Sequence, residues 1–163
     1  MTGAIAPILL GALCLGLLTG LRALTPITVL IWAVHLQHLS VAGTWLSFLD
    51  TKVALVVATL LALLELVSDK LPNTPSRLKP PGLIGRVGTG FLSGCVWMLA
   101  AGEHAWWIGA IVAFIGAPIG AFLGHAARTG LVRVQHFPDF PIALLEDAVA
   151  IGGSIFIVAQ FCR

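Results

Sequence analysis

The sequence predicts an all-α integral membrane protein, a single transmembrane domain (residues 1–163) folded as a bundle of five to six helices. Of its 163 residues, 58% are hydrophobic and only 10% are charged, and the mean hydropathy is +1.02. A soluble domain carries about 25% charged residues, because its surface must be solvated. The expected surroundings are therefore a lipid bilayer. A net charge of +2 without a basic cluster indicates no nucleic-acid partner.

Six apolar runs account for the predicted bundle. A helix needs about 20 largely apolar residues to cross the hydrocarbon core of a membrane. The runs fall at residues 3–21, 25–39, 51–71, 87–102, 105–124 and 140–161. The second run is shorter than a full span. It is followed by residues 40–50, which include Trp45 and are expected at the membrane interface.

The segment Gly20-Leu-Arg-Ala-Leu-Thr-Pro26 breaks the first apolar region, because proline has no amide hydrogen and ends the helix before it. In one interpretation the chain turns at Arg22 and residues 25–38 cross back, which gives six spans. In the other, residues 25–38 form a half-helix or re-entrant arm, which gives five spans and reverses the side of the N-terminus. Broken helices at membrane depth occur only where they are buried in protein or line a cavity, so the second interpretation would point to a functional site.

Basic residues gather in two connections between the runs, residues 71–86 and 125–137. Connections rich in Lys and Arg stay on the cytoplasmic side of a membrane, so both are expected there. Trp106 and Trp107 follow the connection on the opposite side, where an interfacial aromatic belt is expected.

Glycines recur every four residues in three of the runs, a spacing that lets helix backbones approach closely in lipid. They predict close packing within one chain, a homo-oligomer interface, or both. The glycines are Gly16 and Gly20, Gly90 and Gly94, and Gly116, Gly120 and Gly124.

Two short matches suggest an internal, inverted repeat with halves 1–78 and 85–163. Ala62-Leu-Leu-Glu-Leu66 matches Ala143-Leu-Leu-Glu-Asp147, and Gly20-Leu-Arg-Ala resembles Gly124-His-Ala-Ala-Arg128. Paired breaks in two halves are typical of transporters whose site lies at the repeat interface.

Charged side chains inside apolar runs are the candidate site. Each costs about 2.5–3.5 kcal/mol in a membrane, so such groups are usually paired and often functional. One pair of carboxylates lies four residues apart on one helical face, and a second pair begins the last run, toward the same side of the membrane. The expected ion- or substrate-binding residues are Glu65, Asp69, Glu146 and Asp147, with Arg22 and Arg128 as charge partners.

These residues predict a small transporter or channel, coupled to a cation or to protons. An alternative is an enzyme acting on lipid phosphates, with Mg²⁺ held by the carboxylates, although no known catalytic motif is present. The identity of any metal or cofactor stays open. A second alternative is a non-catalytic oligomeric scaffold, in which Arg22 and Arg128 neutralise Glu65 and Glu146 and pin the helices together.

Three segments resemble a bacterial membrane-protein family that is catalogued as domain of unknown function number 4126. They are Gly20-Leu-Arg-Ala-Leu-Thr-Pro26, Glu65-Leu-Val-Ser-Asp-Lys-Leu-Pro72 and Glu146-Asp-Ala-Val-Ala-Ile151. The resemblance runs through essentially the whole chain, while the loop after the second segment departs from longer members. It implies a multi-span protein of the bacterial inner membrane, and it implies no activity.

Overall fold

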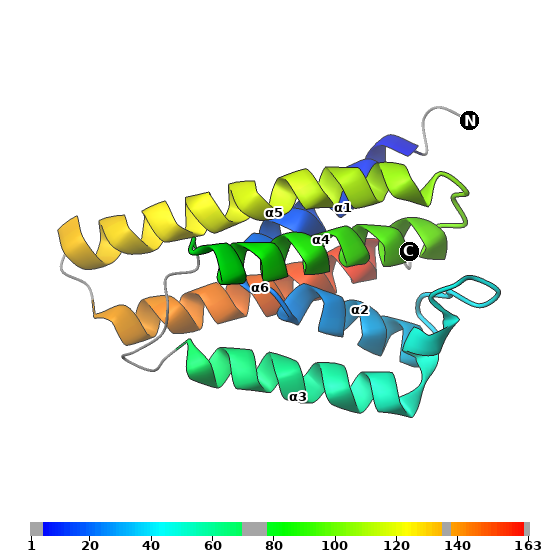
Figure 1. Cartoon of the computed structure of the whole chain (residues 1–163), viewed down its shortest axis with the longest axis horizontal. Helices are drawn as coiled ribbons and strands as arrows, with labels where there is room; N and C mark the ends of the chain where they lie inside the picture. Colours follow the sequence, from blue (N-terminus) through cyan, green and yellow to red (C-terminus); the bar gives the residue numbers. More distant parts are fainter. Residues whose placement is uncertain (1–4, 70–77, 135–137, 162–163) are drawn as a thin grey trace.

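The computed structural model describes residues 5–69, 78–134 and 138–161, and in these residues every regular element is helical. The helices alternate in direction and form an elongated bundle (Figure 1). In chain order they are α1 (Ile5–Leu21), α2 (Thr25–His35), the short 3₁₀ turn η1 (Ser47–Asp50), α3 (Lys52–Ser68), α4 (Pro80–Ala100), α5 (Trp106–Thr129), the π turn η2 (Gly130–Val134) and α6 (Asp139–Phe161).

Three helices are long and apolar enough to cross a membrane: α4, α5 with its extension to Val132, and α6. α1 and α2 are shorter apolar helices. Large apolar side chains cover much of the outer surface, including Ile111, Phe114 and Phe122 on α5. A surface of this kind suits lipid rather than water, so composition and structure together indicate a membrane protein.

The expected helices are present, but two of their boundaries differ from the prediction. α4 starts at Pro80 rather than near residue 87, because Pro80 and Pro81 occupy its first turn, where a missing N–H costs nothing. α5 runs on to Thr129. The expected connections 71–86 and 125–137 are therefore shorter than predicted. Much of each connection lies outside the described residues, including Lys70, Arg77 and the side chain of Arg133.

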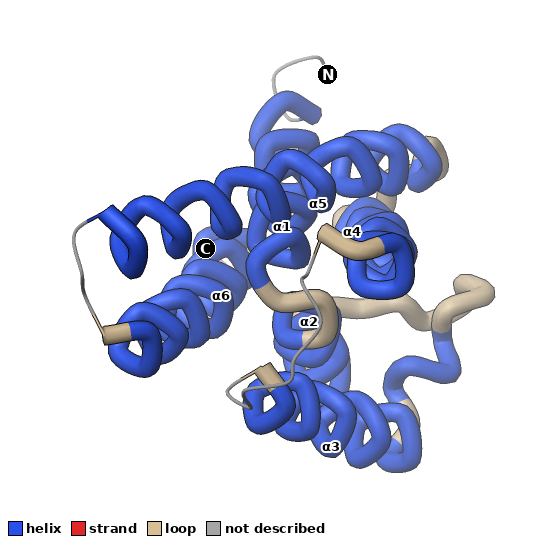
Figure 2. Tube along the Cα trace, turned by 60° about the vertical axis from the view of Figure 1, so that its left-hand side comes forward, coloured by secondary structure: helices blue, strands red, loops and turns tan. Residues whose placement is uncertain are grey.

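α1, α4 and α5 form the closest-packed part of the bundle, and glycines make this possible. Gly16 and Gly20 of α1 face the backbone of α5, and Gly120 of α5 faces the backbone of α1. Gly94 of α4 meets Gly109 of α5 in the same way. Figure 2 shows these three helices crossing next to one another. The glycine faces thus pack within one chain.

α2 lies in the middle of the bundle and is the most buried helix for its length. Eight of its 11 residues are buried, and it spans only about 16 Å at 1.5 Å per residue. Pro26 lies in its first turn, as the break predicts. Beyond α2, irregular chain continues to η1, and its Leu39, Val41 and Leu46 are buried in the same apolar core.

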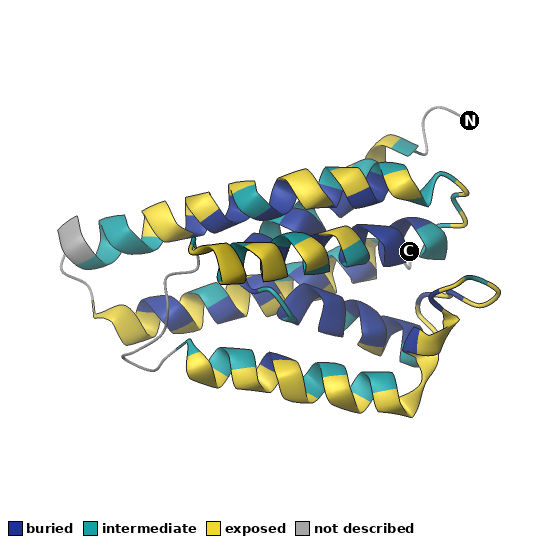
Figure 3. Cartoon of the chain, viewed as in Figure 1, coloured by how far each residue is buried: buried dark blue, intermediate teal, exposed yellow. Residues whose placement is uncertain are grey.

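α3 stands apart at the edge of the bundle (Figures 1 and 3). Ala62 is its one buried residue, and it packs chiefly against α2. Hydrogen bonds hold the two helices together: Thr28 Oγ1 donates to the Ala58 carbonyl at 3.2 Å, and Trp32 Nε1 donates to Thr59 Oγ1 at 3.1 Å. Ala54, Leu55 and Ala58 also pack against the apolar core, so α3 is attached along one face and leaves its other faces exposed.

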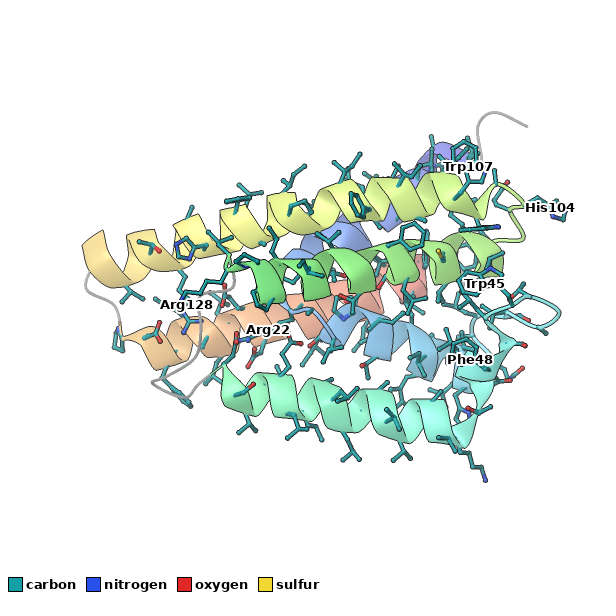
Figure 4. All side chains as sticks on the ribbon, viewed as in Figure 1. Arg22, Trp45, Phe48, His104, Trp107 and Arg128 are labelled. Atoms are coloured by element: carbon teal, nitrogen blue, oxygen red, sulfur yellow. The ribbon has the colours of Figure 1, made fainter. Side chains whose placement is uncertain are left out.

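The two ends of the bundle differ in chemistry. Arg22 and Arg128 lie toward one end, whereas Trp45, Phe48 and Trp107 lie toward the other (Figure 4). At the aromatic end Trp45 meets Trp106 edge to face, with ring centroids 5.8 Å apart. This is the separation that the basic connections and the tryptophans of the sequence predict.

The repeat matches do not share one orientation. Ala62–Leu66 lies near the end of α3 and Ala143–Asp147 near the start of α6, and these two helices run in opposite directions (Figure 1). Arg22 follows α1 and Arg128 lies on α5, and these two helices run in the same direction (Figure 1). The repeat stays a prediction.

Candidate functional site

The site is built around the break between α1 and α2, at Arg22, Ala23 and Leu24. A helix end leaves backbone groups without partners, and here two charged side chains satisfy them. The Glu65 carboxylate of α3 accepts hydrogen bonds from the Ala23 and Leu24 amides, at 2.7 and 2.8 Å. Glu65 therefore caps the start of α2 from another helix, where negative charge is also favoured by the helix dipole.

Arg86 of α4 satisfies the other side of the break. Its Nε donates to the Gly20 carbonyl at the end of α1, and its Nη1 to the Gly82 carbonyl of its own helix, both at 3.1 Å. The residue is only 5% exposed. A cation at a helix C-terminus complements the partial negative charge there, so both ends of the break are held by opposite charges.

Arg22 lies at the centre of the site with none of its surface exposed. Its guanidinium forms ion pairs with Asp69 at the end of α3 and with Asp147 of α6, where Nη2 and Oδ1 are 2.6 Å apart. Nε is buried and has no hydrogen-bond acceptor among the described residues, and Nη2 meets Asp147 outside hydrogen-bonding geometry. One buried cation thus connects α3, α6 and the break.

Arg128 forms a second, more exposed cluster at the same end of the bundle. It holds Asp139 with two hydrogen bonds of 2.8 and 2.7 Å, and its Nη1 lies 3.5 Å from Glu146 Oε2. Asp139 is 55% exposed, so solvent and headgroups screen this pair more than the Arg22 pairs.

Four of the six predicted site residues come together, namely Arg22, Asp69 and Asp147 as ion pairs and Glu65 beside them. The expected pairing of Arg128 with Glu146 is present. The expected pairing of Arg22 with Glu65 is wrong: among the described residues no ion pair joins them, because Glu65 takes the amides of the break and Asp69, one turn later, takes Arg22.

Sequence reasoning overlooked two residues of the site, Arg86 and Asp139. Arg86 was read as part of a basic connection, but Pro80-Pro81 marks a helix start five residues before it, which puts its side chain in the bundle. Asp139 lies in the first turn of α6, where an acidic residue is a helix-start signal. His35 is the last residue of α2 and therefore lies at the end of that helix away from the site, with Nδ1 3.3 Å from the Asp50 carbonyl.

A cavity of about 410 Å³ opens beside the break. Ala23 and Leu24 line it at the break, Glu65 and Asp69 line it from α3, and Lys79 and Arg86 line it from α4 and the residue before that helix. The cavity therefore combines carboxylates on one wall with cations on the opposite wall.

A metal centre has no set of ligands in the part of the chain that the structure describes. No group of three His, Cys, Asp or Glu side chains comes together there in a way that could hold a metal ion. The carboxylates contact Arg22, Arg128 and backbone amides instead.

Comparison with protein-family models, with curated proteins and with solved structures found no match to this chain.

Proposed function

We propose that the protein is a small proton-coupled membrane transporter, whose site is the helix break with Arg22, Glu65, Asp69 and Asp147. The observation that carries the proposal is the fully buried Arg22 between carboxylates of two other helices. Ionisable groups within a membrane mark ion and substrate pathways, and discontinuous helices form the binding sites of many transporters. Glu146 and Arg128 form the outer part of the same site.

In this proposal all six helices lie in the membrane, with α2 and residues 36–50 together making the second span. The described cations Lys79, Arg86 and Arg128 lie at the end of the bundle that we assign to the cytoplasm, following the positive-inside rule. The resemblance to family number 4126 supports a bacterial inner membrane. The segments that carry this resemblance begin at Gly20, Glu65 and Glu146, which all contribute to or border this end.

We infer that α3 is the element that moves. It has one buried residue, it contacts α2 through two hydrogen bonds and a strip of apolar residues, and its end is held through Glu65 and Asp69. An ionised Glu65 accepts from both amides of the break, one with each oxygen. A protonated carboxyl carries a hydrogen on one oxygen, which then becomes a donor. Proton uptake therefore loosens α3 at the wall of the cavity and couples a proton to its opening.

The test is proton flux into liposomes that contain the purified protein and a trapped pH-sensitive dye, under an imposed pH gradient. We expect wild-type protein to dissipate the gradient faster than empty liposomes, and Glu65→Gln and Asp147→Asn to reduce the protein-dependent rate at least tenfold. Asp50→Asn makes the same change as Asp147→Asn at the aromatic end and should retain the wild-type rate. Wild-type liposomes as tight as empty ones would refute the proposal.

The two alternatives gain no supporting observation. An Mg²⁺-dependent enzyme needs carboxylates gathered on the ion, and in the described residues no such group forms. A scaffold that oligomerises through the glycine faces needs those faces on the outside, but Gly16, Gly20 and Gly120 face other helices of the same chain.

A further inference from the structure

The cavity beside the break is too large for a cation alone. Its volume is about 410 Å³, and sites for small organic molecules span about 300–1,000 Å³. Its two walls carry opposite charges, because Glu65 and Asp69 belong to α3 whereas Lys79 and Arg86 belong to the start of α4. A ligand that fills the cavity meets both walls.

The α4 wall has the chemistry of an anion site. Pro80 and Pro81 have no N–H group, so the first amide hydrogen of α4 belongs to Gly82, which lines the cavity. The positive end of a helix dipole favours a carboxylate or phosphate at this position. Lys79 adds an exposed ammonium, and open space surrounds the Gly85 Cα, where a side chain would meet nothing within 4 Å.

The α3 wall has the chemistry of a cation site. Each Glu65 oxygen accepts one amide hydrogen of the break, and an ionised carboxylate offers about four acceptor positions in all. Glu65 can therefore cap α2 and accept an ammonium hydrogen at the same time. Its backbone contacts fix the carboxylate in place before a ligand arrives.

We propose that the ligand of this cavity is a small zwitterion that carries an ammonium group and a carboxylate or phosphate group. This rests on the proposed transport function and names its substrate class. An anion alone makes no contact with the Glu65 carboxylate, and a cation alone makes none with Lys79 and the Gly82 amide. The same chemistry occurs in free amino acids and phosphoamines and in the phosphoethanolamine headgroup of a lipid.

The experiment is isothermal titration calorimetry on the full chain in detergent, with O-phosphoethanolamine, ethanolamine and inorganic phosphate as probes. We expect O-phosphoethanolamine to bind at least tenfold more tightly than ethanolamine or inorganic phosphate, each of which carries charge of one sign. Tenfold is the factor expected for one added charge-assisted hydrogen bond. Lys79→Gln should weaken its binding at least fivefold. The matched control Lys52→Gln removes the same kind of charge at the start of α3, at the aromatic end of the bundle, and should bind as wild type does.

Competition separates the two sources of the zwitterion. Phosphatidylethanolamine added to the micelles displaces O-phosphoethanolamine if the headgroup is the ligand, and leaves its binding unchanged if the ligand is a free solute; phosphatidylglycerol is the control. Equal affinity for all three probes, no binding of O-phosphoethanolamine, or equal effects of Lys79→Gln and Lys52→Gln would overturn the proposal. Binding of O-phosphoethanolamine without proton flux would overturn the transport function but not the zwitterion site. Proton flux without binding of O-phosphoethanolamine would overturn the substrate class but not the transport function.

Discussion

Replacing Arg22 with Met should destabilise the protein more than any other single removal of charge. Arg22 has no exposed surface, and its partners Asp69 and Asp147 expose only 15% and 10% of their side chains. Arg22→Met keeps much of the side-chain volume but removes the buried cation that both carboxylates contact. Removing one partner of a buried ion pair costs about 3–5 kcal/mol. For a chain of 150–250 residues each 1 kcal/mol lowers the melting temperature by about 2–4 °C, so we expect a fall of about 10 °C.

The assay is thermal unfolding in detergent, followed by the fluorescence of the five tryptophans. Arg128→Met is the matched control, because it removes the same kind of side chain from a pair whose Asp139 is 55% exposed. The exposed Asp139 pair contributes about 1 kcal/mol or less, and the contact of Arg128 with Glu146 is 3.5 Å long, so the loss should be smaller than for Arg22→Met. Adding Asp69→Asn and Asp147→Asn to Arg22→Met should restore at least half of the lost stability, because it also removes the two buried negative charges that Arg22 contacts in the native protein.

The reasoning would be refuted if Arg22→Met and Arg128→Met lowered the melting temperature equally. It would also be refuted if the triple variant were less stable than Arg22→Met alone, since buried charge would then not be the cause of the loss. The stability changes of substitutions in contact are not additive, so the test is whether the two Asn substitutions raise or lower the stability of Arg22→Met.

Three further predictions follow from the packing. Gly120→Val should prevent folding or lower the free energy of unfolding by more than about 3 kcal/mol, because the valine Cβ would overlap the backbone of α1 and α1 can move only by separating from α5. The control Gly152→Ala, with no neighbour within 4 Å, should leave the melting temperature unchanged or raise it. Thr51→Ala should cost about 1 kcal/mol through loss of the side-chain cap of α3, and Thr51→Ser should restore it in the same melting assay. In the folded protein, maleimide should label Cys14, which is partly exposed, at least tenfold faster than the fully buried Cys95, and unfolding in SDS should remove the difference.

Local signals in the sequence were enough to predict most of the helices and the break. The glycine spacing and Pro26 act on their own segment, so their effect does not depend on the rest of the fold. The partners of Arg22 were harder to predict, because Glu65 and Asp69 lie on one face of α3 and either could reach the arginine. Which carboxylate pairs with Arg22 depends on the two backbone amides at the break that Glu65 accepts from, and these amides are left without helical acceptors only because α1 ends at Leu21.

The role of Arg86 was missed for a related reason. A basic residue next to a proline-rich connection resembles a cytoplasmic loop charge, and the positive-inside rule uses such residues only to predict which side of the membrane the loop is on. Only the packing of α4 against α1 brings its guanidinium to the Gly20 carbonyl. The position of α3 at the edge of the bundle is likewise a property of the whole assembly, since its apolar composition matches that of the buried helices.

The chain order of the Arg22 contacts has a consequence for synthesis. α1 is synthesised before α5, with which it packs most extensively, and the two partners of Arg22 are 47 and 125 residues further along. Until α6 has been made, the arginine has at most one of its two carboxylates. The charge in the break therefore has no carboxylate partner until Asp69 has been synthesised, 47 residues later. A chain that stops before Asp147 can pair Arg22 with Asp69 but cannot tie the break to α6.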